Sequence, residues 1–279
     1  MIKTIRGALI QISSWKTDLR VIMAFALGFV LLCLNGYPYL KFAAFLKSEV
    51  QAFELSVICG STGYAFLALF LGNLLLLSNA PFITDVTTYE LLRSGKKQWI
   101  DSKILYIVLS SVLYSIMLMV ASAVFSAFKG TVSFKNEWSY AMLELAIKQP
   151  IYSVDSFRIA FPERMFVETV NPYTAVVLTV ICNSMYSILI SMTMMCVNLL
   201  SSRNWGWIVA SLIHIGGYVI FANAGFMFPQ KYSLFCHGMP AYYIQEIGHY
   251  SIIGTVCFVL AVFLILREIC LFASKRMQV

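Results

Sequence analysis

The chain has 279 residues, of which 60% are hydrophobic and only 12% are charged, and its mean hydropathy is +0.80. Soluble domains carry about 25% charged residues, so this composition excludes a cytosolic enzyme, a disordered chain and a nucleic-acid-binding domain. The net charge of +7 is typical of a membrane protein that places its Lys and Arg residues in cytoplasmic loops. Because one span needs about 20 apolar residues, the length accommodates about six spans with their loops.

The first 20 residues are predicted to form a helix that lies in the membrane interface. Ile2, Ile5 and Leu9 recur at near-helical spacing, with basic residues such as Lys3 and Arg6 between them. A segment of this kind is too polar to span a bilayer and suits the cytoplasmic interface. No small-residue cleavage site follows it, which favours a retained anchor over a removed signal peptide.

Six apolar runs are predicted to span the membrane. Asn35-Gly36-Tyr37-Pro38 is expected to end the first span by its turn chemistry, and Asn79-Ala80-Pro81 the second. Glu54 falls near the outer end of the second span, where we expect it to reach lipid headgroups. The predicted spans are residues 21–34, 53–77, 104–128, 173–200, 205–226 and 251–272.

Two of the connections between the predicted spans are long enough to form structure of their own. Residues 84–103 form the most polar short segment of the chain, and residues 129–172 predict an external loop or small subdomain. Within that loop we expect a helix around residues 138–147, interrupted beyond it by Pro150 and Pro162. Residues 1–279 are thus one transmembrane domain.

The charge distribution predicts the orientation. If both termini are cytoplasmic, that side holds 12 of the 20 basic residues and five of the 13 acidic residues, which is the whole surplus of +7. The other side is neutral. Basic residues in short loops favour the cytoplasm, so an even number of spans with both ends inside fits best. The expected location is the plasma membrane.

The connection at residues 84–103 also carries a short helical pattern. Asp85 or Thr87 is a suitable N-cap, Glu90 and Arg93 are spaced for an ion pair, and Ser94-Gly95 provides a stop. Leu91, Leu92 and Trp99 offer apolar anchors among these charges, so one face is suited to dock on a cytosolic protein. The alternative is a solvated loop that only follows the positive-inside tendency.

This organisation resembles that of the membrane subunits of type-2 ABC exporters. The run from Leu77-Ser78-Asn79-Ala80-Pro81-Phe82 through Glu90-Leu91-Leu92-Arg93-Ser94-Gly95 to Lys103-Ile104-Leu105-Tyr106 is similar to that of permeases in Gram-positive bacterial peptide and bacteriocin-immunity exporters. The resemblance implies an N-terminal elbow helix and a coupling helix that docks in a groove of a separate ATPase. Residues 129–172 are longer than the family's usual connection. The ATPase-contacting residues so implied are Asp85, Tyr89, Glu90, Leu91, Leu92, Arg93, Lys96, Lys97 and Trp99.

The sequence lacks nucleotide-binding motifs, which agrees with a transporter whose ATPase is a separate chain. Gly95-Lys96-Lys97 lacks the remaining glycine and the hydroxyl residue of a P-loop, so ATP and Mg²⁺ are expected on the partner ATPase. No catalytic or metal-ligating motif occurs, and Cys236 beside His237 is interpreted as chance. We therefore assign no catalytic, cofactor-binding or metal-binding residue to this chain.

Polar residues within the spans are the candidates for a translocation pathway. His214 lies mid-span without a carboxylate partner on its helix, so an interhelical hydrogen bond competes with a functional role. A stripe of small hydroxyl residues and methionines along residues 173–200 suits either helix packing or contact with amphipathic cargo. The candidate pathway residues are Ser184, Ser187, Ser191, Met194, Asn198 and His214.

The sequence therefore predicts an all-α membrane subunit of an ATP-driven exporter that moves hydrophobic or amphipathic substrates outward, with peptides preferred. Two copies of the chain and two ATPase subunits are expected to assemble among the membrane lipids. Three alternatives stay open: export of lipids or drugs by the same machinery, a membrane enzyme, and a channel or scaffold that needs no ATPase.

Overall fold

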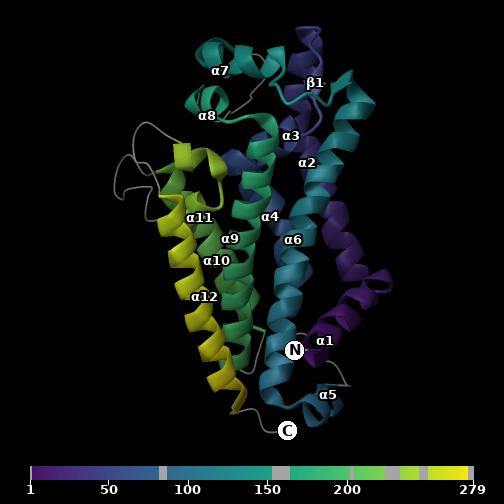
Figure 1. Ribbon diagram of the computed structural model, residues 1–279, viewed down its shortest axis with the longest axis vertical. Helices are drawn as coiled ribbons and strands as arrows, with labels where there is room; N and C mark the ends of the chain where they lie inside the picture. The colour runs from purple at the N-terminus through teal and green to yellow at the C-terminus, as the bar shows by residue number, and fades with distance from the viewer. Residues whose placement is uncertain are drawn as a thin grey trace.

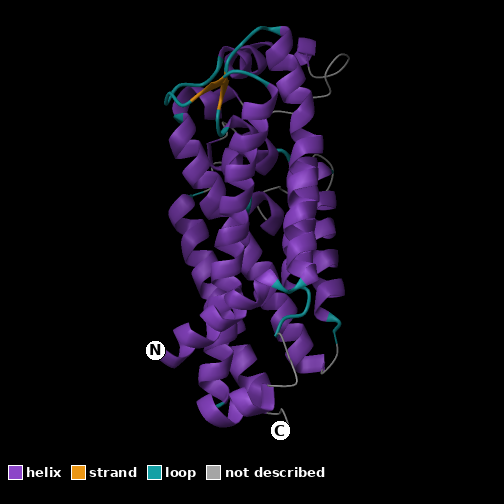
Figure 2. Cartoon of the chain, turned by 90° about the vertical axis from the view of Figure 1, so that its right-hand side faces the viewer, coloured by secondary structure: helices purple, strands orange, loops and turns teal. Residues whose placement is uncertain are grey.

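The computed structural model describes residues 2–81, 87–152, 164–201, 204–223, 233–244 and 251–275. Within these residues the protein is a bundle of long helices (Figure 1). Short helices cap the bundle at both ends: α1 and α5 at one end, α7 and α8 at the other. The last turn of α12 lies at the same end of the bundle as α1 and α5 (Figure 1), and Figure 2 shows the chain from a second side.

The helices and strands have the following bounds. In chain order they are α1 (Ile2–Ser13), η1 (Ser14–Lys16), α2 (Leu19–Phe45), β1 (Val50–Gln51), α3 (Glu54–Ser61), α4 (Gly63–Leu77), α5 (Thr87–Ser94), α6 (Lys96–Lys129), β2 (Val132–Ser133), α7 (Tyr140–Tyr152), α8 (Arg164–Thr169), α9 (Pro172–Ser201), α10 (Gly206–Ala222), α11 (Leu234–His237), η3 (Pro240–Ile244) and α12 (Ile252–Lys275).

Four helices of the described residues are long and apolar enough to cross a membrane, namely α2, α6, α9 and α12. Together α3 and α4 give a fifth candidate, and α10 is a shorter apolar helix of 17 residues. The protein is therefore an all-α membrane protein with four to five clear candidate spans, whereas the sequence predicted six. These helices differ in how deeply they are buried: 61% of the apolar window of α9 is buried inside the chain, but only 17% of that of α12.

The predicted end of the first span is wrong. The helix α2 continues through Pro38 to Phe45 and does not stop in the Asn35–Pro38 turn signal. Two tertiary contacts override the local turn chemistry: a Cβ added at Gly36 would collide with Leu55, and the Tyr39 side chain is fully buried. Asn35 also donates from Nδ2 to the Leu31 carbonyl one turn back, which satisfies its amide within the helix.

The second predicted span is not one continuous helix. The axes of α3 and α4 differ by 96°, and Thr62 between them is extended, with φ −99° and ψ 123°. Gly63 begins α4 against the ring of Phe221, where a Cβ would not fit. Close packing at this position therefore favours a sharp bend within an otherwise apolar run.

The connection between β1 and α3 contacts residues 129–139, which are distant in the sequence. Strands β1 and β2 pair in parallel, with Val50 opposite Val132. Glu54, expected to reach headgroups, is instead 0% exposed. Its carboxyl group accepts hydrogen bonds from the Tyr39 hydroxyl at 2.6 Å, the Gln51 amide at 3.1 Å and the Ser139 amide at 2.6 Å. The sequence prediction for Glu54 is thus wrong, because three donors replace solvent around it.

The connection at residues 129–172 contains the predicted helix. Residues 138–147 overlap α7, although α7 extends through Pro150 to Tyr152 where the sequence predicted an interruption. The short helix α8 follows, and Pro162 lies outside the described residues.

Close helix contacts hold α2, α4 and α6 together. The Tyr114 hydroxyl of α6 donates to the Leu69 carbonyl of α4 at 2.8 Å. Gly72 allows this approach, because a Cβ there would stand 2.8 Å from the Ala24 carbonyl oxygen of α2 and closer still to the Tyr114 hydroxyl. A small residue at this position is therefore a requirement of the packing.

Candidate functional site

The candidate site is the junction between α5 and α6. Helix α5 ends at Ser94, whose Oγ donates to the Glu90 carbonyl at 2.6 Å, and the Gly95 amide donates to the Leu91 carbonyl at 2.8 Å. Gly95 has φ 78° and ψ 153°, a conformation that is essentially restricted to glycine. The predicted stop at Ser94-Gly95 is confirmed, but the next helix begins at Lys96, so within the described residues 87–103 every position except Gly95 is helical.

The two faces of α5 differ in exposure. Tyr89 is 71% and Leu92 is 78% exposed, while Leu91 is 7% exposed and belongs to the core. Trp99 on α6 is only 1% exposed. Of the three apolar anchors predicted for docking, Leu91 and Trp99 are thus buried inside the chain. The outward apolar pair is Tyr89 and Leu92.

Glu90 links α5 to α6 instead of pairing along its own helix. Its Oε2 lies 3.3 Å from Nζ of Lys103 and accepts from Nε1 of Trp99 at 3.2 Å. The Lys103 ammonium also lies 5.3 Å from the centre of the Trp99 ring. The predicted ion pair with Arg93 is absent from the described residues, because the carboxylate serves the almost fully buried Lys103 side chain, which is 3% exposed.

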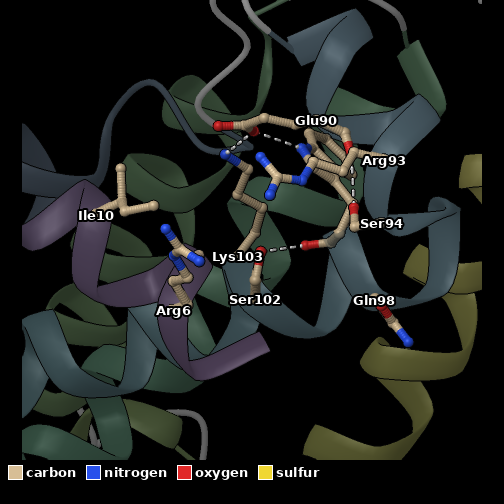
Figure 3. Close-up of a pocket in the computed structure, with 10 residues that line it drawn as sticks. Arg6, Ile10, Glu90, Arg93, Ser94, Gln98, Ser102 and Lys103 are labelled. Atoms are coloured by element: carbon tan, nitrogen blue, oxygen red, sulfur yellow. Dashed lines mark hydrogen bonds and ion pairs between the residues drawn. The ribbon is translucent and has the colours of Figure 1, made fainter. Parts of the chain in front are cut away.

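A cavity of about 270 Å³ opens between α1, α5 and α6 (Figure 3). In Figure 3 the side chains of Arg93 and Lys103 extend toward each other, and Arg6 lies on the α1 side. Helix α1 sits close to α6 here, because a Cβ at Gly7 would come within 3.1 Å of Ser102. The sequence does not predict Arg6 at this site, because Arg6 lies on α1, far before α5 in the chain.

The remaining predicted coupling residues occupy several positions. Asp85 lies outside the described residues. Arg93 and Lys97 are exposed, and Lys96 is partly exposed in the first turn of α6. The junction therefore presents an outward surface of Tyr89, Leu92 and Lys97 in addition to its cavity.

The hydroxyl stripe of α9 faces α6 within a single chain. Ser184 donates to Ser115 Oγ at 3.1 Å, and Ser187 donates to Ser111 Oγ at 2.9 Å. Asn198 donates from Nδ2 to the Ala80 carbonyl at 2.5 Å, and its Oδ1 accepts from the Gly206 amide at the start of α10 at 2.6 Å. All these residues are buried, which favours helix packing as their role.

The other candidate pathway residues are also in the interior. Ser191, Met194 and His214 are each 0% exposed. His214 Nδ1 lies 2.7 Å from the Tyr186 hydroxyl, and Nε2 lies 3.1 Å from the Leu67 carbonyl oxygen. The interhelical hydrogen bond that competed with a functional role for His214 is therefore present.

Internal cavities near the stripe are small. One between α4, α6 and α9 has a volume of about 20 Å³ and is lined by Asn73, Asn183 and Ser187, among others. Such a volume holds about one water molecule. Both polar atoms of the Asn73 amide lack a partner within the described residues, so an ordered water here would satisfy them.

The surroundings of Cys236 and His237 do not favour metal binding. Cys236 is 0% exposed, and burial raises the pKa of its thiol to about 12, which opposes the thiolate that binds metals. His237 Nδ1 lies 3.1 Å from Thr255 Oγ1. Within the described residues no group of three or more His, Cys, Asp or Glu side chains gathers around one point.

No protein-family model matches the chain, and no significantly similar curated protein or solved structure was found. The function must therefore be inferred from the α5–α6 junction and from the resemblance in sequence.

Proposed function

We propose that the chain is the membrane subunit of an ATP-driven exporter of the type-2 ABC class, and that α5 is its coupling helix. The observation that supports this most is the outward pair Tyr89 and Leu92 on a short helix at the end of the bundle. Large exposed apolar side chains on an otherwise polar helix are typical of a protein-binding surface.

The attachment of α5 suits the transmission of force. A push on the Tyr89 and Leu92 face passes into α6 through the Gly95 turn and through the contacts of Glu90 with Lys103 and Trp99. Helix α6 is 34 residues long and runs to the opposite end of the bundle (Figure 1). ATP-driven closure of two partner ATPases would therefore tilt α6 in each of two copies of this chain.

The proposal puts the translocation pathway between the two copies. The cavities within one chain near the α9 stripe hold about a water molecule, so they are too small for cargo. The preferred cargo is a hydrophobic or amphipathic peptide, and lipids or hydrophobic drugs are the alternatives. ATP and Mg²⁺ would bind the ATPase, which leaves this chain without catalytic residues.

The test is purification of the tagged full-length chain from membranes of its own host in mild detergent. Wild-type protein is expected to retain a P-loop ATPase subunit and to hydrolyse ATP. The double variant Tyr89→Ala/Leu92→Ala is expected to lose most of both, with unchanged helix content and Tm. These exposed residues are better targets than Glu90, because Glu90 also stabilises the fold.

The matched control is Phe134→Ala, which removes an exposed aromatic side chain (67% exposed) beyond β2 at the far end of the bundle. It is expected to retain the ATPase at the wild-type level. Wild-type protein without an associated ATPase would overturn the exporter proposal and favour an enzyme, a channel or a scaffold. A double variant that retains the ATPase with full turnover would overturn the assignment of α5.

A further inference from the structure

The cavity between α1, α5 and α6 carries an excess of positive charge. Arg6, Arg93 and Lys103 line it together with a single carboxylate, Glu90, so the lining carries a net charge of +2. Within the described residues neither Arg6 nor Arg93 has an acidic partner. Two guanidinium groups beside one cavity thus have hydrogen-bond donors available for an anion.

Lys103 adds a second, independent observation. Its side chain is 3% exposed, and its ammonium has three N–H donors. In the part of the chain that the structure describes, one hydrogen bond is made, to Glu90 at 3.3 Å. A buried ammonium with donors to spare, beside an open cavity, is suited to bind an anionic group that enters from outside.

The cavity wall is also partly apolar. Ile10 of α1 lines the cavity and is 56% exposed, and Leu9 beside it is 53% exposed. Helix α1 is thus amphipathic and suited to lie in the membrane interface. A soluble phosphate compound would leave this apolar surface in water, whereas an acyl chain would cover it.

We propose that this cavity binds the headgroup of an anionic phospholipid, with Arg6, Arg93 and Lys103 on the phosphate and an acyl chain along α1 at Ile10. Basic pockets between membrane helices are known to select anionic headgroups. The proposal concerns the isolated chain and does not depend on an ATPase. Failure of the exporter proposal would leave it standing, and the reverse also holds.

The first experiment titrates the purified full-length chain in nonionic detergent with a short-chain phosphatidylglycerol. Phosphatidylcholine of equal chain length, glycerol phosphate and inorganic phosphate are titrated in parallel. Thermal unfolding and native mass spectrometry report binding. Phosphatidylglycerol is expected to raise Tm in a saturable manner and to remain bound in the mass spectrum, whereas the other three are expected to have little effect.

Single-charge variants locate the site. Arg93→Gln and Arg6→Gln are each expected to weaken phosphatidylglycerol binding by about fivefold, as expected for one basic group near a lipid headgroup. The matched control Lys16→Gln removes an exposed positive charge just after α1 but outside the cavity lining. It is expected to bind like wild type. Arg93 is exposed and forms no ion pair with another described residue, so its variant is expected to fold normally.

Three results would overturn the proposal. Equal effects of phosphatidylglycerol and phosphatidylcholine on wild-type protein would show that the cavity does not select lipids by headgroup charge. This comparison needs no variant. Equal potency of glycerol phosphate would show a site for free phosphate compounds. A loss in Lys16→Gln as large as that in Arg93→Gln would show general surface attraction.

Discussion

The Nζ atom of Lys103 lies 3.3 Å from Oε2 of Glu90, and this pair joins the short helix α5 to the long helix α6. The two partners differ in their environment: the Lys103 side chain is 3% exposed and that of Glu90 is 40% exposed. The ammonium therefore depends on the carboxylate, whereas the carboxylate can also be solvated by water.

This asymmetry predicts unequal effects of removing each charge. Glu90→Gln is expected to cost about 1–2 kcal/mol of stability, because it leaves a buried ammonium without its counterion. Adding Lys103→Met to Glu90→Gln is expected to recover part of that loss. Thermal unfolding in one detergent would measure both effects, and strictly additive changes in Tm would contradict the prediction.

Gly95 is predicted to be required for the angle between α5 and α6. Alanine at its φ of 78° and ψ of 153° is expected to cost about 1–3 kcal/mol, and the α5 amides should exchange faster with deuterium. Gly130 at the other end of α6 is the control, since its extended backbone suits any residue and no atom lies near an added Cβ. If Gly130→Ala has an equal effect, the turn geometry is not the cause.

Gly72 is predicted to tolerate no side chain. Gly72→Ala is expected to cost about 1–3 kcal/mol, because its Cβ would push α4 away from the Ala24 carbonyl and the Tyr114 hydroxyl. Gly216→Ala, in α10 with open space around it, is expected to be neutral or stabilising by up to about 1 kcal/mol. Comparison of the two midpoints of thermal unfolding separates packing from helix propensity.

The contact between Tyr186 and His214 is predicted to be structural. Tyr186→Phe is expected to destabilise by about 1–2 kcal/mol, since it leaves the buried His214 Nδ1 without its partner. The control is Tyr218→Phe on α10, because the Tyr218 hydroxyl makes no hydrogen bond to another described residue. An unchanged Tm in Tyr186→Phe would return His214 to the list of functional candidates.

The sequence predicted features whose causes are local. The stop at Ser94-Gly95 depends on residues within one turn of the chain, so it is visible in the sequence and present in the structure. The same holds for the amphipathic helix α1 and for the helix around residues 138–147. Long apolar runs likewise indicated α2, α6, α9 and α12, with errors confined to their ends.

Features with distant causes were not predicted. Glu90 pairs with Lys103 and not with Arg93, because the fold buries an ammonium beside it. The helix α2 passes Pro38 because Gly36 packs on Leu55, which lies on another element. The bend at Thr62 depends on a contact between Gly63 and Phe221, which are far apart in the chain. Arg6 likewise lines the cavity only because α1 packs against α6, which is distant in the sequence.

The burial of Glu54 has a consequence for the order in which the protein is made. Its carboxyl group is bound by Tyr39, already synthesised, and by the amide of Ser139, which emerges from the ribosome 85 residues later. Until then one carboxyl oxygen lacks its donor, at the start of an apolar segment. The start of α3 therefore completes its set of hydrogen bonds only after the whole of α6 and the residues up to Ser139 have been synthesised.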